Sequence, residues 1–231
     1  KLIKRPIVLF FITLILIGCS DKSEPNQDKI QKDEIEIVAS QLQIPWSITK
    51  LHDVFYISER GGTIAKIEEG VVTRQKVNLS ESLSKVSEAG LLGFVLSPNF
   101  ETSQTAYAYY TYDHNGQPTN RIVSLIYDGK AWTEQTILVD HIPSGAVHHG
   151  GRLKLGPDGL LYTTTGDAAN RDLAQQENSL AGKILRLHVD GTIPTDNPNP
   201  ASYIFSLGHR NPQGLTWDED GTLYATEHGN S

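Results

Sequence analysis

The sequence predicts an all-β protein with the architecture of a β-propeller. Its strand-like segments are short and rich in β-branched and aromatic residues, and dipeptides typical of tight turns separate them. One hairpin sequence also recurs along the chain. A propeller repeats one small antiparallel sheet radially, so recurrence of a hairpin favours it over other all-β folds.

Three segments carry the strand signal most clearly: residues 34–38, 106–112 and 121–127. Each is bounded by Gly, Asn, Asp or Pro, which end strands. Helical signals are few. We expect a helical turn or two only within residues 80–86 and 170–180, where they would lie inside loops.

Tight turns are predicted at six dipeptides in which Asn, Asp or Gly precedes Gly. Both central residues of such a dipeptide accept positive φ at low cost, which suits two-residue hairpin turns. The six dipeptides are Gly61-Gly62, Asn115-Gly116, Asp128-Gly129, Asp158-Gly159, Asp190-Gly191 and Asp220-Gly221.

The recurring hairpin is clearest in two stretches, residues 153–164 and 215–226, whose Asp-Gly turns are 62 positions apart. Weaker copies begin at Trp46 and Leu92. Each copy reads as strand, tight turn and strand, with tyrosine on the second strand. About four blades' worth of chain is therefore present. The alternative is a large β-sandwich, but a sandwich does not require one hairpin sequence to recur.

Composition narrows the class of partner. The 231 residues include 20 Lys and Arg against 27 Asp and Glu, a formal net charge of −7. No long basic stretch offsets this charge, which excludes a nucleic-acid partner held by phosphate neutralisation. An apolar fraction of 38% with 20 Gly and 11 Pro indicates a turn-rich folded domain. The single cysteine excludes an internal disulfide and a thiolate zinc cluster.

The first residues are typical of an export signal. Basic residues at positions 1, 4 and 5 precede the uncharged stretch 6–18, which is too short to span a membrane. The stretch ends in Leu16-Ile17-Gly18-Cys19, which resembles the lipobox of bacterial lipoproteins. That resemblance implies cleavage before Cys19 and a diacylglyceryl group on its sulfur. The alternative is an ordinary secretory signal with a chance cysteine.

We therefore expect three parts: a lipoprotein signal peptide at 1–18, a flexible tether at 19–34 and a partial propeller at 35–231. The polar, aromatic-free composition of the tether suits a spacer. The domain would be exported and held at the outer face of the cell membrane, or in a periplasm. The lipid on Cys19 would be its one membrane contact.

Candidate chemistry begins in the glycine-rich stretch 145–153, which contains His148. A histidine can act as a general base near neutral pH. Asp167 follows one hairpin later, so the two side chains are expected to face each other. A carboxylate that accepts a hydrogen bond from the Nδ1–H group leaves Nε2 free as the base. The alternative for Asp167 is a turn residue bonded to its own backbone. Four other histidines are expected to be structural or solvated: His52, His114, His141 and His188.

A second cluster spans residues 208–214, Gly-His-Arg-Asn-Pro-Gln-Gly, followed one hairpin later by 227–230, Glu-His-Gly-Asn. The donors of Arg210 and Asn211 suit a polyanionic or quinone-like ligand that carries several carboxylates. Backbone carbonyls at a glycine turn are oxygen ligands that Ca²⁺ accepts, which makes Gly229 a candidate metal ligand.

Together with Gly90-Leu91-Leu92-Gly93, these motifs resemble the soluble PQQ-dependent glucose and aldose sugar dehydrogenases, the glucose/sorbosone dehydrogenase family. The resemblance runs from about Pro45 to Ser231. It implies a six-bladed propeller that binds pyrroloquinoline quinone (PQQ) and Ca²⁺ on its top face. It also implies oxidation of an aldose at C1 to the lactone, with hydride passing to the quinone and electrons to an external acceptor.

The resemblance also assigns the catalytic roles. His148 would take the hydroxyl proton from C1, and Asp167 would orient and polarise His148. Arg210 and Asn211 would bind the quinone, with Arg210 stabilising its developing negative charge.

For the remaining positions, the resemblance implies a metal site at Gly229 and Asn230, where Asn230 stands in place of an expected proline. Glu88 falls where some members carry glutamine near the sugar, so it is the candidate substrate-binding residue. Arg152 and Gln213 are expected to be structural supports.

The family's later lysine and arginine ligands for PQQ, and its last blades, have no counterpart in this sequence. We therefore expect the 231 residues to be C-terminally incomplete and inactive alone. Two other functions stay open. One is a non-catalytic propeller that binds a ligand or partner. The other is a Ca²⁺-dependent lactonase, which would recruit Asp167 and Glu227 as acidic ligands.

Overall fold

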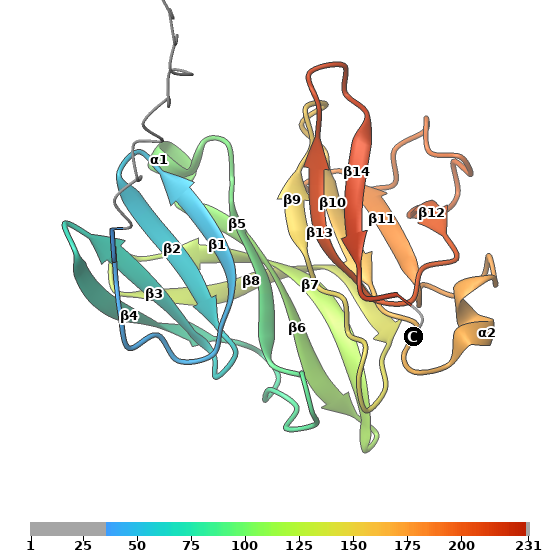
Figure 1. Ribbon diagram of the computed structural model, residues 1–231, viewed down its shortest axis with the longest axis horizontal. Coiled ribbons are helices and arrows are strands. Elements are labelled where there is room, and N and C mark those ends of the chain that lie inside the picture. Colours follow the sequence, from blue (N-terminus) through green and yellow to red (C-terminus); the bar gives the residue numbers. More distant parts are fainter. Residues whose placement is uncertain (1–35, 230–231) are drawn as a thin grey trace, which may run out of the picture. The chain divides into compact units, whose positions relative to one another are not determined.

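Antiparallel strands provide nearly all the regular structure in the computed structural model, which describes residues 36–229 (Figure 1). The compact unit begins at Val38. The predicted signal peptide 1–18, the tether 19–34, the lipidation site Cys19 and the metal residue Asn230 lie outside the described residues. Neither helix of the described part has the length and apolar character of a membrane span.

The strands form successive antiparallel units. The first comprises β1 (Pro45–Leu51), β2 (Val54–Glu59), β3 (Thr63–Glu68) and β4 (Val71–Asn78). The second comprises β5 (Leu91–Leu96), β6 (Thr105–His114), β7 (Gln117–Tyr127) and β8 (Ala131–Pro143), with the helix α1 (Phe100–Ser103) after β5. The third comprises β9 (Leu153–Leu155), β10 (Leu161–Thr165), β11 (Lys183–Leu187) and β12 (Ile204–Leu207), with α2 (Arg171–Ala174) after β10. A fourth unit begins with β13 (Pro212–Trp217) and β14 (Leu223–Glu227).

This order confirms the propeller prediction, because four-stranded antiparallel units of this kind are propeller blades. Every copy of the recurring hairpin falls on the first two strands of a unit. The chain thus supplies three complete blades and the first two strands of another, close to the predicted four.

The outer strands of the first two blades also pair with each other. Residues 76–78 of β4 lie parallel to residues 131–133 of β8, which joins the two blades into one eight-stranded sheet.

Apolar side chains fill the spaces between consecutive blades. Strand β6 shows how, because its side chains alternate between two sides. Tyr110 and Tyr112 pack in the core shared with the first blade, around the fully buried Trp132. Tyr107 and Tyr109 pack in the core shared with the third blade. Smaller cores lie within the first blade and between the third and fourth. Because successive side chains of a strand point to opposite sides, one strand packs against both neighbouring blades and so fixes their relative positions.

The turns lie at the predicted positions, but only some of them have the predicted backbone conformation. Asn115 and Gly116 both have positive φ, 52° and 75°, as a tight hairpin requires. In the Asp-Gly turns only the glycine does. In three of them the aspartate carboxylate instead accepts a backbone N–H two residues on, at 2.8 Å for Asp128, 3.1 Å for Asp158 and 3.0 Å for Asp190.

Three local predictions need correction. Residues 80–86 contain no helix, because Leu83 forms a β-bridge with Tyr112 and the Glu134 carboxylate holds Ser80. Residues 36–38 of the expected first strand lie outside any strand, and β1 starts only at Pro45. Helix α1 was not expected, whereas α2 lies within the predicted stretch 170–180.

Candidate active site

His148 and Asp167 meet at one end of the β9–β10 hairpin. His148 precedes β9 and Asp167 follows β10, and His148 Nδ1 lies 2.8 Å from Asp167 Oδ1. Both side chains are largely buried, with 14% of His148 and 2% of Asp167 exposed. Asp167 Oδ1 also accepts the Ala169 N–H at 2.8 Å, which fixes the carboxylate. Because the carboxylate accepts, Nδ1 is the donor and Nε2 is left without a partner among residues 36–229.

The backbone around this pair is strained. Glu88, His148, Ala168 and Ala169 all have φ between 57° and 67°, a region that non-glycine residues rarely adopt. The His148 N–H donates to Glu88 Oε2 at 3.1 Å, so a hydrogen bond links two of these four residues. Such strain clusters at functional sites, where the surrounding structure must maintain it.

Residues 208–214 bind directly to this pair. The Asp167 N–H donates to the Arg210 carbonyl at 2.7 Å. The Gly150 N–H and Gln213 Nε2 both donate to Asn211 Oδ1, at 3.0 and 2.9 Å. Asn211 is therefore fixed by the third and fourth blades together. The motifs that are far apart in sequence thus form one hydrogen-bonded assembly.

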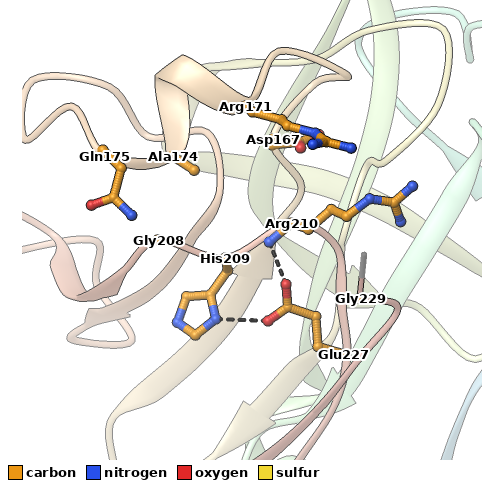
Figure 2. A pocket seen from close by; sticks show the side chains of 9 residues that line it. All are labelled: Asp167, Arg171, Ala174, Gln175, Gly208, His209, Arg210, Glu227 and Gly229. Carbon is orange, nitrogen blue, oxygen red and sulfur yellow. Dashed lines mark hydrogen bonds and ion pairs between the residues drawn. The ribbon is translucent and has the colours of Figure 1, made fainter. Parts of the chain in front are cut away.

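A pocket of about 390 Å³ opens beside this assembly (Figure 2). Asp167 and Arg210 both line it, and the Arg210 guanidinium donates to the His228 carbonyl at 3.0 Å. His148 is not among its lining residues and meets the pocket through Asp167. The lining residues are Asp167, Arg171, Ala174, Gln175, Gly208, His209, Arg210, Glu227 and Gly229.

Glu227 organises the fourth-blade side of the pocket. Its carboxylate accepts the Arg210 N–H through one oxygen and contacts His209 Nδ1 at 3.0 Å through the other (Figure 2). Burial raises the pKa of Glu227, but the hydrogen bonds from Arg210 and His209 outweigh it and leave the pKa below its usual value. The ionised carboxylate is thus favoured in the folded protein.

Glu227→Gln is expected to reduce the pH dependence of stability. Because folding lowers the pKa of Glu227, its carboxylate contributes stability above the unfolded-state value of about 4.5, and this contribution is lost as the pH falls further. Urea unfolding at pH 7 and pH 4 should show a smaller loss in the variant than in the wild type. Equal losses would mean that Glu227 does not stabilise this side of the pocket in its ionised form.

A buried lysine holds α2 against the pocket. Lys183 is fully buried, and its ammonium donates to the carbonyls of Leu173, Ala174 and Ala181 at 2.9, 2.9 and 2.6 Å. Burial lowers the pKa of Lys183 to about 8. These bonds fix α2, which places Arg171 and Ala174 on the pocket wall.

The pocket's donors fit a ligand with several carboxylates. Arg171 and Arg210 line it together with Gln175 (Figure 2). Arginine recognises carboxylates well, so PQQ fits this donor set. For Ca²⁺, Gly229 lines the pocket, although residues 36–229 contain no group of three or more His, Cys, Asp or Glu suited to a metal. Calcium accepts backbone carbonyls, which the predicted ligand Gly229 would supply.

The predicted support Arg152 and the four surface histidines do not line this pocket. Arg152 donates to the Trp46 carbonyl and lies 5.1 Å above its ring, with its pKa lowered by burial. His52, His114, His141 and His188 are not buried in the core.

Two pocket residues were not expected from the sequence, Arg171 and Gln175; no role was predicted for His209 within the stretch 208–214, or for Glu227 as an organiser of Arg210. The helical signal at 170–180 is the one feature that pointed toward the first two. His149 was also missed. It is 1% exposed and bonded through both ring nitrogens, to Ser144 and to the Ser87 carbonyl.

Comparison with known proteins matches residues 42–231 to the model of the Glucose / Sorbosone dehydrogenase family. The chain belongs to this family. Among its curated relatives, the quinoprotein glucose dehydrogenase B of Acinetobacter calcoaceticus is 34% identical over 170 residues, which cover 61% of this chain and 36% of the relative. The aldose sugar dehydrogenase YliI of Escherichia coli is 30% identical over 214 residues, covering 84% and 56%.

Solved structures place the fold of this glucose/sorbosone dehydrogenase family member among the β-propeller sugar dehydrogenases. The PQQ-bound aldose sugar dehydrogenase of Streptomyces coelicolor matches with a TM-score of 0.78 and 36% identity, covering 85% of this chain and 60% of that one. The apo form of the soluble aldose sugar dehydrogenase of Escherichia coli matches with a TM-score of 0.74 and 26% identity, covering 84% and 60%. The chain spans 60% or less of the length of these relatives.

Proposed function

We propose that this protein oxidises an aldose at C1 to the lactone, with PQQ as hydride acceptor and His148 as general base. The observation that carries the proposal is the hydrogen-bonded chain from His148 Nδ1 to Asp167 and from the Asp167 N–H to the Arg210 carbonyl, at 2.8 and 2.7 Å. It connects the base, through its orienting carboxylate, to the pocket that Asp167 and Arg210 line.

The chain's own residues account for the proton and the charge. Asp167 holds the Nδ1 proton of His148, so Nε2 can take the proton of the C1 hydroxyl. Loss of that proton and of hydride from C1 converts the C1–O single bond to the carbonyl of the lactone. Arg210 would oppose negative charge that develops on the acceptor. PQQ, when bound, supplies the two-electron acceptor, and Ca²⁺ at Gly229 would polarise it as a Lewis acid.

The neighbouring residues support these roles. Arg171 and Gln175 would hold carboxylates of the cofactor, with α2 fixed by Lys183. Asn211 would contact the cofactor from the position that Gly150 and Gln213 fix. The lactonase alternative is less well supported, because both its candidate acids are already engaged: Asp167 with His148 and Glu227 with Arg210 and His209.

The decisive experiment supplies the purified full-length protein with PQQ, Ca²⁺, glucose and an electron-accepting dye. We expect dye reduction that requires both sugar and PQQ, with gluconolactone as product. Omission of PQQ is the matched control. Binding of PQQ without sugar-dependent dye reduction would contradict the proposal and favour a non-catalytic propeller. Calcium-dependent hydrolysis of added gluconolactone would favour the lactonase.

A further inference from the structure

The loop before β5 contacts two adjacent histidines, the candidate base His148 through its backbone N–H and His149 through its ring. Glu88 Oε2 accepts the His148 N–H at 3.1 Å. One residue earlier, the Ser87 carbonyl contacts His149 Nε2 at 2.8 Å. These contacts join the second blade to the third, between residues that are 60 and 62 positions apart in the sequence.

The histidine side of the Ser87 contact has a defined protonation. A carbonyl only accepts, so His149 Nε2 carries the hydrogen. His149 Nδ1 then accepts from the Ser144 hydroxyl at 2.6 Å. Burial lowers the pKa of His149, which favours this neutral form. His149 is therefore a fixed anchor beside His148 and does not compete for a proton near neutral pH.

The loop itself is held by the first blade. Arg60 Nε donates to the Ala89 carbonyl at 3.0 Å, and the Leu91 N–H donates to the Arg60 carbonyl at 3.1 Å. Gly90 has a φ of 135°, and a Cβ there would overlap the Arg60 carbonyl oxygen. Glu88 thus presents its carboxylate from a loop that has little freedom to move.

We propose that Glu88 is a positioning residue for His148 rather than a sugar-binding residue. Its carboxylate satisfies the N–H of a histidine whose φ of 67° is unfavourable for a side-chain-bearing residue. Without this acceptor the backbone relaxes, and Nδ1 leaves its 2.8 Å contact with Asp167. This inference rests on the proposed function only in taking His148 as the base.

Two substitutions distinguish the role of the Glu88 carboxylate as a hydrogen-bond acceptor from the role of its negative charge. Glu88→Gln keeps an oxygen acceptor, whereas Glu88→Ala removes it. For the alanine variant we expect kcat for the aldose to fall about 10- to 100-fold with KM changed less than about threefold, as misplacement of a catalytic group predicts. The glutamine variant should restore kcat to within about threefold of the wild type. Glu81→Ala, an exposed position on the same loop, is the matched control and should leave both constants unchanged.

A second measurement does not depend on turnover. In ¹⁵N-histidine-labelled protein without sugar, Glu88→Ala should shift the His148 ring resonances, and Glu88→Gln should not. A rise in KM at unchanged kcat would overturn the inference and assign Glu88 to sugar binding. Unchanged His148 resonances in the alanine variant would also overturn it. If the wild type oxidises no sugar, the proposed function fails, while the resonances still decide whether Glu88 positions His148.

Discussion

Replacing His148 by alanine is expected to lower kcat for aldose oxidation by about 10²- to 10⁴-fold, the usual contribution of a positioned general base. The proton of the C1 hydroxyl would then have to pass to water. Asp167 cannot replace His148 as the base, because its carboxylate is only 2% exposed and is held in place by the Ala169 N–H. Steady-state kinetics of the full-length protein with glucose, PQQ and an electron-accepting dye measure the loss.

The control for this substitution is His52→Ala. His52 lies on the surface, with a side chain 71% exposed that contacts only Glu101 at 3.2 Å among the described residues. It should retain wild-type kinetics, and both variants should keep the far-ultraviolet circular dichroism of the wild type. Turnover by His148→Ala within a few-fold of wild type would remove this residue from the mechanism.

Replacing Gly166 by alanine is expected to damage both stability and activity. Gly166 precedes Asp167, and a Cβ there would fall on the carbonyl oxygen and carbon of His148. Both are backbone atoms, so no side-chain rotation relieves the overlap, and the two loops must separate. Forced overpacking of this kind costs about 1–3 kcal/mol or more in the free energy of unfolding. Separation would also stretch the His148–Asp167 contact and lower kcat.

Gly61→Ala is the matched control for Gly166→Ala. A methyl group added at Gly61 would meet no atom within 4 Å, and this glycine does not have a positive φ. The free energy of unfolding of the Gly61 variant should stay within about 0.5 kcal/mol of wild type. Urea unfolding of both variants makes the comparison. Equal stability for the two would show that the β9 and β10 loops can separate without cost.

The sequence predicted what depends on short-range patterns. Hairpins recur because each blade must bury a similar pair of strands, so residues 153–164 and 215–226 could be recognised as equivalent. The same logic placed His148 opposite Asp167, because a hairpin brings its two ends together. In these cases the information lies within about 20 residues of chain.

Contacts between distant segments escaped prediction. The sequence near Ser80 does not indicate that Glu134 binds it. The local sequence therefore predicts a helical turn at residues 80–86, whereas these tertiary contacts hold the segment in a non-helical conformation. Glu227 was considered only as a metal ligand, since the need of Arg210 for an acceptor is visible only in three dimensions. The hydrogen bond from the His148 N–H to the carboxylate of Glu88, which the family resemblance implies as a sugar-binding residue, is likewise visible only in three dimensions.

The parallel contact between β4 and β8 has a consequence for how the protein can be shortened. Outermost strands present rows of unpaired backbone groups that invite association with other molecules. Residues 76–78 and 131–133 cover part of each other's edge, so a piece that ended after β4 would uncover it. Any portion that contains β4 should therefore also extend through β8, and a piece that ends after β4 is expected to self-associate through the exposed edge.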